Sequence, residues 1–266
     1  EILESDIGWY HNVMNLLRNW FLIQTSAVND NSRGVKFKDE IMGELIRFVS
    51  AHEVGHTIGL PHNMGSSFAY HVDSLRSPTF TSNHGVAPSI MDYARFNYVA
   101  QPEDGVTNFY PRVGSYDIWS VKWGYTYFDG EDQNSEKRIL NNWIIEKADN
   151  YDYWFGYSNG IDPRSQTESI GSDNMDASYY GLLNLKRIVP NLIDWTYEDG
   201  KNYDDLKELY LNVYSQFRRY IGHVSTNVGG IYENLKSNDQ DGDVYTHVPK
   251  NIQRKAINFL NSNVFT

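Results

Sequence analysis

The sequence predicts an α+β protein that is mostly helical. Two observations point to this class. Apolar residues recur at spacings of three and four in several long segments, as on one face of an α-helix, whereas the alternation typical of a strand is seen only at residues 1–7. The chain has 266 residues, 40% of them hydrophobic and 15% aromatic, which is enough apolar material for a substantial core in one or two domains.

The first two elements are predicted within residues 1–25. Residues 1–7 alternate weakly and suit a short strand at the edge of a sheet. Residues 8–25 carry apolar side chains at helical spacing and predict a helix, on the positions Val13, Leu16, Leu17, Trp20 and Phe21. A turn-rich loop at residues 29–34 follows this helix.

A second helix is predicted near residues 39–59. Asp39 is the candidate N-cap, and Gly59 with Pro61 marks the end, because glycine tolerates the left-handed conformation that ends helices. One stripe of this helix contains Ile41, Leu45, Phe48, His52 and His56. Two histidines are therefore predicted to lie on a buried face.

The remaining chain is predicted to be ordered loop followed by helices. Residues 63–112 are rich in Ser, Pro, Asn and Gly and indicate loop. Helical patterning resumes near residues 116–124, after the polar stretch 129–138, and across 176–195, 203–222 and 250–262. The second half of the chain is therefore predicted to be mostly helical.

Charge and composition exclude several kinds of partner and site. The net charge of −11 disfavours a nucleic acid as partner, because its phosphates would be repelled on average. There is no cysteine, so metal ligands must be His, Asp or Glu. No run approaches the roughly 18 apolar residues needed to span a bilayer, so no transmembrane segment is predicted.

The segment that carries chemistry is His52-Glu53-Val54-Gly55-His56-Thr57-Ile58-Gly59-Leu60-Pro61-His62. At about 100° per residue, His52 and His56 lie about 40° apart on one helix face, so both imidazoles can reach one ion. Glu53 points about 100° away from His52, where its carboxylate can reach a water on the same metal. Gly59 lets the backbone turn sharply and brings His62 round as a third ligand. The pattern predicts a zinc site of three histidines with an open fourth position.

This arrangement predicts metal-assisted hydrolysis of peptide bonds. Three neutral imidazoles leave zinc with its double positive charge, which lowers the pKa of bound water from about 15.7 toward roughly 7. Glu53 would take the proton as the water attacks a carbonyl carbon, and later deliver it to the leaving amine. The alternative is three core histidines held by hydrogen bonds alone. A chance H-E-x-x-H would occur about once in a hundred such chains, and Gly59 and His62 make chance rarer by roughly another few hundred-fold.

Two motifs together resemble the metzincin metallopeptidases. His52-Glu53-x-x-His56-x-x-Gly59-x-x-His62 matches their zinc signature, and Ser89-Ile90-Met91-Asp92-Tyr93 is similar to their Met-turn. The resemblance implies that Met91 forms a hydrophobic floor beneath the ligands without binding the metal. It also implies that Tyr93 approaches the metal and stabilises the oxyanion, although a tyrosine that merely packs its ring is the alternative.

More closely, the chain resembles the bacterial Met-zincin family. The similar segments are residues 47–63, 89–97, 116–125, 162–178 and 223–233. The likeness implies a metzincin-like catalytic core at residues 1–128, with a truncated N-terminal sheet, and a helical C-terminal subdomain at residues 129–266 packed on that core. It also implies a peptide substrate and a secreted, periplasmic or outer-envelope location. Two departures from better-known metzincins bear on substrate binding: the upper sheet is represented only by residues 1–7, and Asn63 follows the third histidine.

Two other functions stay open from the sequence. The chain could be a zinc-holding structural or binding module without peptidase activity, although a structural site needs no base and usually has four protein ligands. It could also be a zinc hydrolase of a non-peptide amide or ester. Asp117 is predicted either to stabilise a helix N-terminus or to support a ligand histidine. The remaining histidines lack ligand spacing, and the sequence Asp239-Gln240-Asp241-Gly242-Asp243 is predicted to be a solvated turn.

Overall fold

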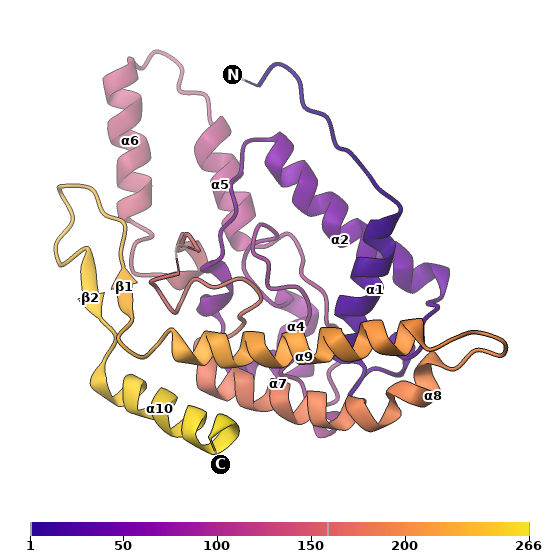
Figure 1. Ribbon diagram of the computed structural model, residues 1–266. Helices are drawn as coiled ribbons and strands as arrows, with labels where there is room; N and C mark the ends of the chain where they lie inside the picture. Colours follow the sequence, from indigo (N-terminus) through magenta and orange to yellow (C-terminus); the bar gives the residue numbers. More distant parts are fainter. Residues whose placement is uncertain (1, 159, 266) are drawn as a thin grey trace.

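The described residues of the computed structural model, 2–158 and 160–265, are mostly helical and contain a single two-stranded hairpin (Figure 1). The mostly helical part of the predicted fold class is therefore confirmed. No helix among the described residues is both long and apolar enough to cross a membrane.

The first half of the chain supplies the two helices that the sequence predicts. They are α1 (Asn12–Thr25) and α2 (Asp39–Thr57). Lys38, one residue before the predicted cap, is the N-cap of α2, and Asp39 lies with Glu40 in the first turn, where carboxylates interact favourably with the helix dipole. The predicted loop at residues 63–112 contains only short helical turns: η2 (Ser66–Ala69), α3 (Val72–Leu75), α4 (Pro78–His84) and η3 (Pro102–Asp104), while η1 (Asp30–Ser32) follows α1.

The second half is helical apart from the hairpin. Its helices are α5 (Ser115–Tyr125), α6 (Gln133–Ile145), η4 (Tyr151–Tyr153), α7 (Asn174–Ile188), η5 (Val189–Asn191), α8 (Leu192–Thr196), α9 (Asp204–Ser225) and α10 (Lys250–Val264). Strands β1 (Ile231–Glu233) and β2 (Tyr245–His247) pair antiparallel, with Tyr232 opposite Thr246. The turn predicted at residues 239–243 lies in the connection between them. Helices α7 and α9 lie side by side, and α10 packs near one end of the pair (Figure 1).

The predicted strand at residues 1–7 is wrong for its described part. Residues 2–10 have no regular structure and are exposed, while Glu1 lies outside the described residues. A strand needs a partner to satisfy its backbone groups, and the only paired strands in the described chain, β1 and β2, pair with each other. The truncated N-terminal sheet is therefore absent from the described residues.

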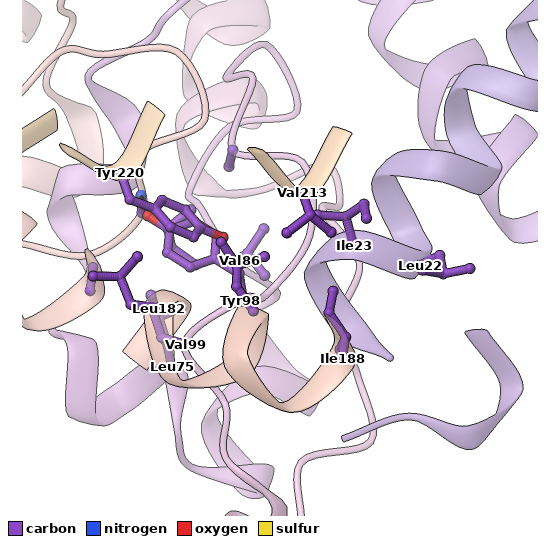
Figure 2. Close-up of a cluster of buried hydrophobic side chains, with 14 of the residues drawn as sticks. Leu22, Ile23, Leu75, Val86, Tyr98, Val99, Leu182, Ile188, Val213 and Tyr220 are labelled. Carbon is purple, nitrogen blue, oxygen red and sulfur yellow. Dashed lines mark hydrogen bonds between the residues drawn. The ribbon is translucent and has the colours of Figure 1, made fainter. Parts of the chain in front are cut away.

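The largest hydrophobic cluster joins both halves of the chain (Figure 2). It combines Leu22 and Ile23 of α1 with the segment of residues 70–99 and with buried side chains of α7 and α9. Tyr98 and Tyr220 lie at its centre, fully buried, with ring centroids 4.7 Å apart. A second cluster, which contains Phe21, Phe48 and Met91, lies between α1, α2 and residues 90–109. This second cluster thus fixes α2 along one face. The predicted boundary between a catalytic core and a C-terminal subdomain at residue 128 stays a prediction.

Candidate metal centre

The three predicted ligands come together at the C-terminal end of α2. His52 and His56 lie one turn apart on the helix, and the helix ends at Thr57. Gly59 has φ +90°, and two backbone bonds close the turn: Gly59 N–H donates to His56 O at 2.9 Å, and Leu60 N–H donates to Gly55 O at 3.0 Å. This reversal brings His62 back against the other two rings.

The spacing of the three nitrogens fits a zinc ion. His62 Nε2 lies 3.0 Å from His56 Nε2 and 3.2 Å from His52 Nε2. A tetrahedral site with Zn–N distances of about 2.0–2.1 Å separates its nitrogens by roughly 3.3–3.4 Å. Unprotonated nitrogens at such short separations repel one another, and a cation between them removes the repulsion. In the described part of the chain, this is the only group of three or more His, Asp or Glu residues that could hold a metal.

Backbone carbonyls fix the tautomer of two ligands. His52 Nδ1 lies 2.8 Å from Ile90 O, and His56 Nδ1 lies 2.8 Å from Leu60 O. A carbonyl only accepts, so each Nδ1 carries the proton and each Nε2 lone pair is free for a metal. Burial lowers the pKa of His52 and of His62, and their histidine neighbours lower it further. Both rings are therefore held in the neutral form that ligation requires.

Met91 closes the site from below. It is fully buried, and its Sδ would lie only 2.2 Å from a Cβ atom placed on Gly55. Gly55 lies in α2 one residue before His56, so the absence of a side chain there lets the thioether pack directly on the helix. The backbone is joined as well, because Asn63 N–H donates to Met91 O at 3.1 Å.

Asp117 supports the segment that holds His52, and it does both things that the sequence left open. Its carboxylate accepts hydrogen bonds from Ser89 Oγ at 2.6 Å, from Ile90 N–H at 2.8 Å and from Gly114 N–H at 2.9 Å. The bond from Gly114 caps the start of α5. The other two bonds hold Ser89 and Ile90 in place, and the carbonyl oxygen of Ile90 binds His52. Burial raises the pKa of Asp117, although these three bonds favour its ionised form.

Glu53 and Tyr93 lie beside the three histidines. The Tyr93 ring centroid is 4.5 Å from that of His62 and 5.0 Å from that of His52. Burial raises the pKa of Tyr93, and the negative charge of Glu53 raises it further. Glu53 is half-buried on α2 and its charge also acts on His52 and His62. A carboxylate and a phenol thus lie close to the three histidines.

Asn63, the departure noted in the sequence, joins two parts of the chain. It is fully buried, its side-chain amide donates to Trp154 O at 2.9 Å, and its side-chain oxygen accepts from Gly156 N–H at 3.0 Å. No sequence pattern pointed to this contact. A cleft of about 1410 Å³ opens beside it, bordered by the turn at residues 57–61 and by the aromatic rings of Trp119 and Trp123, but not by the three histidines.

The other histidines lie outside this centre. His223 differs from them because it is buried in α9, with its Nε2 2.9 Å from Thr167 O. Since the carbonyl accepts, Nε2 carries a proton, and burial lowers the pKa of His223 to about 4, so the ring is neutral at neutral pH.

One comparison with known proteins returns a match. The family model described as Met-zincin matches residues 34–266. This range includes the three histidines, Glu53, the turn at residues 89–93 (the Met91 turn) and all elements from α2 to α10. Neither the comparison with curated proteins nor that with solved structures returns a match.

Proposed function

The chain belongs to the Met-zincin family, and on that premise we propose that it is a zinc-dependent endopeptidase. In this proposal His52, His56 and His62 hold the metal, Glu53 is the general base, and Tyr93 stabilises the oxyanion. The observation that carries the proposal is the convergence of three histidine Nε2 atoms beside a carboxylate.

Bound zinc would supply a water of lowered pKa and would polarise the substrate carbonyl. Glu53 would accept the proton of that water during attack on the carbonyl carbon and would then donate it to the leaving nitrogen. Tyr93 keeps its phenolic proton at neutral pH, as a tyrosine of ordinary pKa does, and burial raises its pKa further, so it would donate a hydrogen bond to the developing oxyanion. The fixed rings of His52 and His56 contribute by keeping the metal position constant.

A peptide is the substrate class that the family likeness favours. The cleft beside the turn at residues 57–61 has a volume of about 1410 Å³, which exceeds the roughly 300–1,000 Å³ usual for small-molecule pockets. It is open and aromatic, as a surface for an extended chain would be. The predicted location, secreted, periplasmic or at the outer envelope, rests on the family likeness and stays a prediction.

The test compares the wild-type protein with Glu53→Gln for zinc content and for cleavage of casein and a peptide library. We expect about one zinc per chain in both proteins. Cleavage should fall by roughly 10²- to 10⁴-fold in the variant, because the base is lost while the ligands remain. Glu44→Gln on the same helix is the matched control, since Glu44 pairs with Arg47 on the surface. Undiminished cleavage by Glu53→Gln would contradict the assigned base.

A zinc-holding module without peptidase activity is the second candidate. It is favoured by the absence of a strand at residues 2–10, because many peptide-binding sites pair the ligand with a strand edge. Zinc binding by a wild-type protein that cleaves no peptide, ester or amide would support this candidate. Cleavage of esters or amides alone would instead indicate a non-peptide hydrolase.

Tyr93→Phe tests the oxyanion donor separately. We expect kcat to fall by roughly 10²- to 10³-fold, the usual loss for one such donor, with zinc content unchanged. Full activity in this variant would show that the Tyr93 ring only packs.

A further inference from the structure

A buried ion cluster, formed by Glu168, Arg95 and Arg219, lies next to the segment that carries Tyr93. The Glu168 side chain is fully buried, with its Oε1 2.5 Å from Arg95 Nη1 and 3.0 Å from Arg219 Nε. The Arg95 side chain is 14% exposed, and its guanidinium lies 3.4 Å from the centroid of the Trp20 ring. One carboxylate thus joins the segment after the Met91 turn to α9, while the Arg95 guanidinium packs on α1.

Glu168 also holds the backbone of Tyr93 itself. Its N–H donates to Tyr93 O at 2.8 Å. The two residues that form the ion pair are the only described non-glycine residues with positive φ, +56° at Arg95 and +63° at Glu168. Left-handed backbone at such residues persists only where the surroundings fix it. Glu168 thus holds the Tyr93–Arg95 segment at both ends: its N–H binds the carbonyl of Tyr93, and its carboxylate binds the side chain of Arg95.

The charges of this cluster depend on one another. Burial raises the pKa of Glu168 and lowers the pKa of Arg95 to about 10, whereas each charge favours the ionised form of the other. Arg95 is therefore charged at neutral pH. Loss of the Glu168 charge would leave two positive charges side by side at a largely buried position. Arg95 would then have to move, and Tyr93 lies only two residues away.

We propose that Glu168 is a positioning residue, which acts through Arg95 and through the Tyr93 carbonyl to hold the Tyr93 ring against His52 and His62. The proposal rests on the proposed function, because the Tyr93 hydroxyl matters to catalysis only if the site is a peptidase. It goes beyond that function by assigning a role to Glu168 and Arg95, which lie outside the zinc signature and the Met-turn.

A double-mutant cycle tests this role. Glu168→Gln keeps the shape and the N–H but removes the charge, so we expect kcat to fall about 10-fold with KM and zinc content little changed. In a Tyr93→Phe background the same substitution should change kcat by less than about 2-fold, because the hydroxyl to be positioned is already absent. Equal losses in both backgrounds would overturn the proposal, since a purely structural role does not depend on that hydroxyl.

Hydrogen exchange measured by mass spectrometry supplies a readout that needs no activity. We expect Glu168→Gln to speed exchange at residue 168 and in residues 93–97 in the metal-free protein. Glu208→Gln is the matched control: Glu208 accepts a hydrogen bond from Asn19 and so also joins α9 to α1, but it does not contact residues 93–95. Exchange that is unchanged in Glu168→Gln, or equally faster in the control, would overturn the proposal.

Two further arms keep the outcome clear. If Glu168→Gln does not fold, the double variant Glu168→Gln/Arg95→Met removes both buried charges and enters the same cycle. Arg219, whose side chain is 39% exposed, can be hydrated there. An inactive wild-type protein would refute the proposed peptidase, while the exchange result would still decide whether Glu168 holds the Tyr93 segment.

Discussion

At the scale of single residues, Gly55 determines how close α2 lies to Met91. Glycine inside a helix costs about 1 kcal/mol relative to alanine. Here that cost is offset by packing, because Met91 Sδ occupies the space that a Cβ would need. A glycine is therefore needed between His52 and His56, because any side chain at position 55 would collide with Met91.

Gly55→Ala should lower both stability and zinc affinity. A Cβ atom would meet Met91 Sδ at 2.2 Å, so Met91 must move, which we expect to cost about 1–3 kcal/mol in the free energy of unfolding. Urea unfolding of the metal-free protein and a competition titration with zinc would measure the two effects. Gly43→Ala, on the same helix with no atom within 4 Å of its added Cβ, should instead be neutral or stabilising by up to about 1 kcal/mol. Equal behaviour of the two variants would contradict the steric account.

The sequence predicted the residues of the centre that depend on local geometry. The approach of His52 to His56 follows from helical spacing, and the return of His62 follows from the left-handed Gly59. The same reasoning could not find Glu168 or Arg95. Their contact joins distant segments through a buried ion pair, and neither residue lies in a pattern with a known spacing.

At the scale of elements, the centre depends on a connection between α5 and the Met91 turn. The carboxylate of Asp117 caps α5 and holds Ser89 and Ile90, and Ile90 O in turn orients His52. Residues that orient a metal ligand in this indirect way usually change metal affinity when they are replaced.

Asp117→Asn should therefore weaken zinc binding by roughly 10- to 100-fold. The amide has one acceptor oxygen where the carboxylate has two, so at least one of the three hydrogen bonds is lost. Asp132→Asn is the control, because Asp132 caps α6 in the same way by accepting from Asn134 and Ser135 but is remote from the Met91 turn. Zinc competition titrations would compare the two variants, and an unchanged affinity in Asp117→Asn would exclude this support.

Helices were predicted more accurately than strands, for a physical reason. An amphipathic helix such as α9 satisfies its own backbone bonds and shows its buried face within 22 residues of sequence. A strand depends on a partner elsewhere. Strands β1 and β2 have three residues each and no alternation in burial, so the hairpin was missed. The weak alternation at residues 1–7 instead predicted a strand, and residues 2–7, its described part, pair with no other segment that the structure describes.

At the scale of the whole molecule, burial links folding to pH through His223. This side chain is fully buried and neutral, and burial lowers its pKa to about 4. The unfolded chain has a histidine pKa of about 6.5, so it takes up this proton first as the pH falls. The free energy of unfolding should therefore decrease between about pH 6.5 and pH 4.

His223→Gln should reduce that decrease. The shift from about 6.5 to about 4 corresponds to about 3 kcal/mol across this window, a contribution that the non-titrating variant lacks. The Gln amide can still donate to Thr167 O, as His223 Nε2 does. Urea unfolding at several pH values would measure the difference. Parallel curves for the two proteins would show that His223 does not contribute to the acid sensitivity.

The packing of α1 also determines when its apolar face can be buried during synthesis, because the helices that cover this face come much later in the chain. Helix α1 ends at Thr25, yet the apolar face that it presents is covered by α7 and α9, the first of which begins at Asn174. At about 5–20 residues per second, a ribosome needs roughly 7–30 s to make the intervening chain. Through that interval the side chains of Leu22 and Ile23 have no native partners on those helices. A nascent chain of this protein therefore exposes the side chains of Leu22 and Ile23 until α7 and α9 have been made.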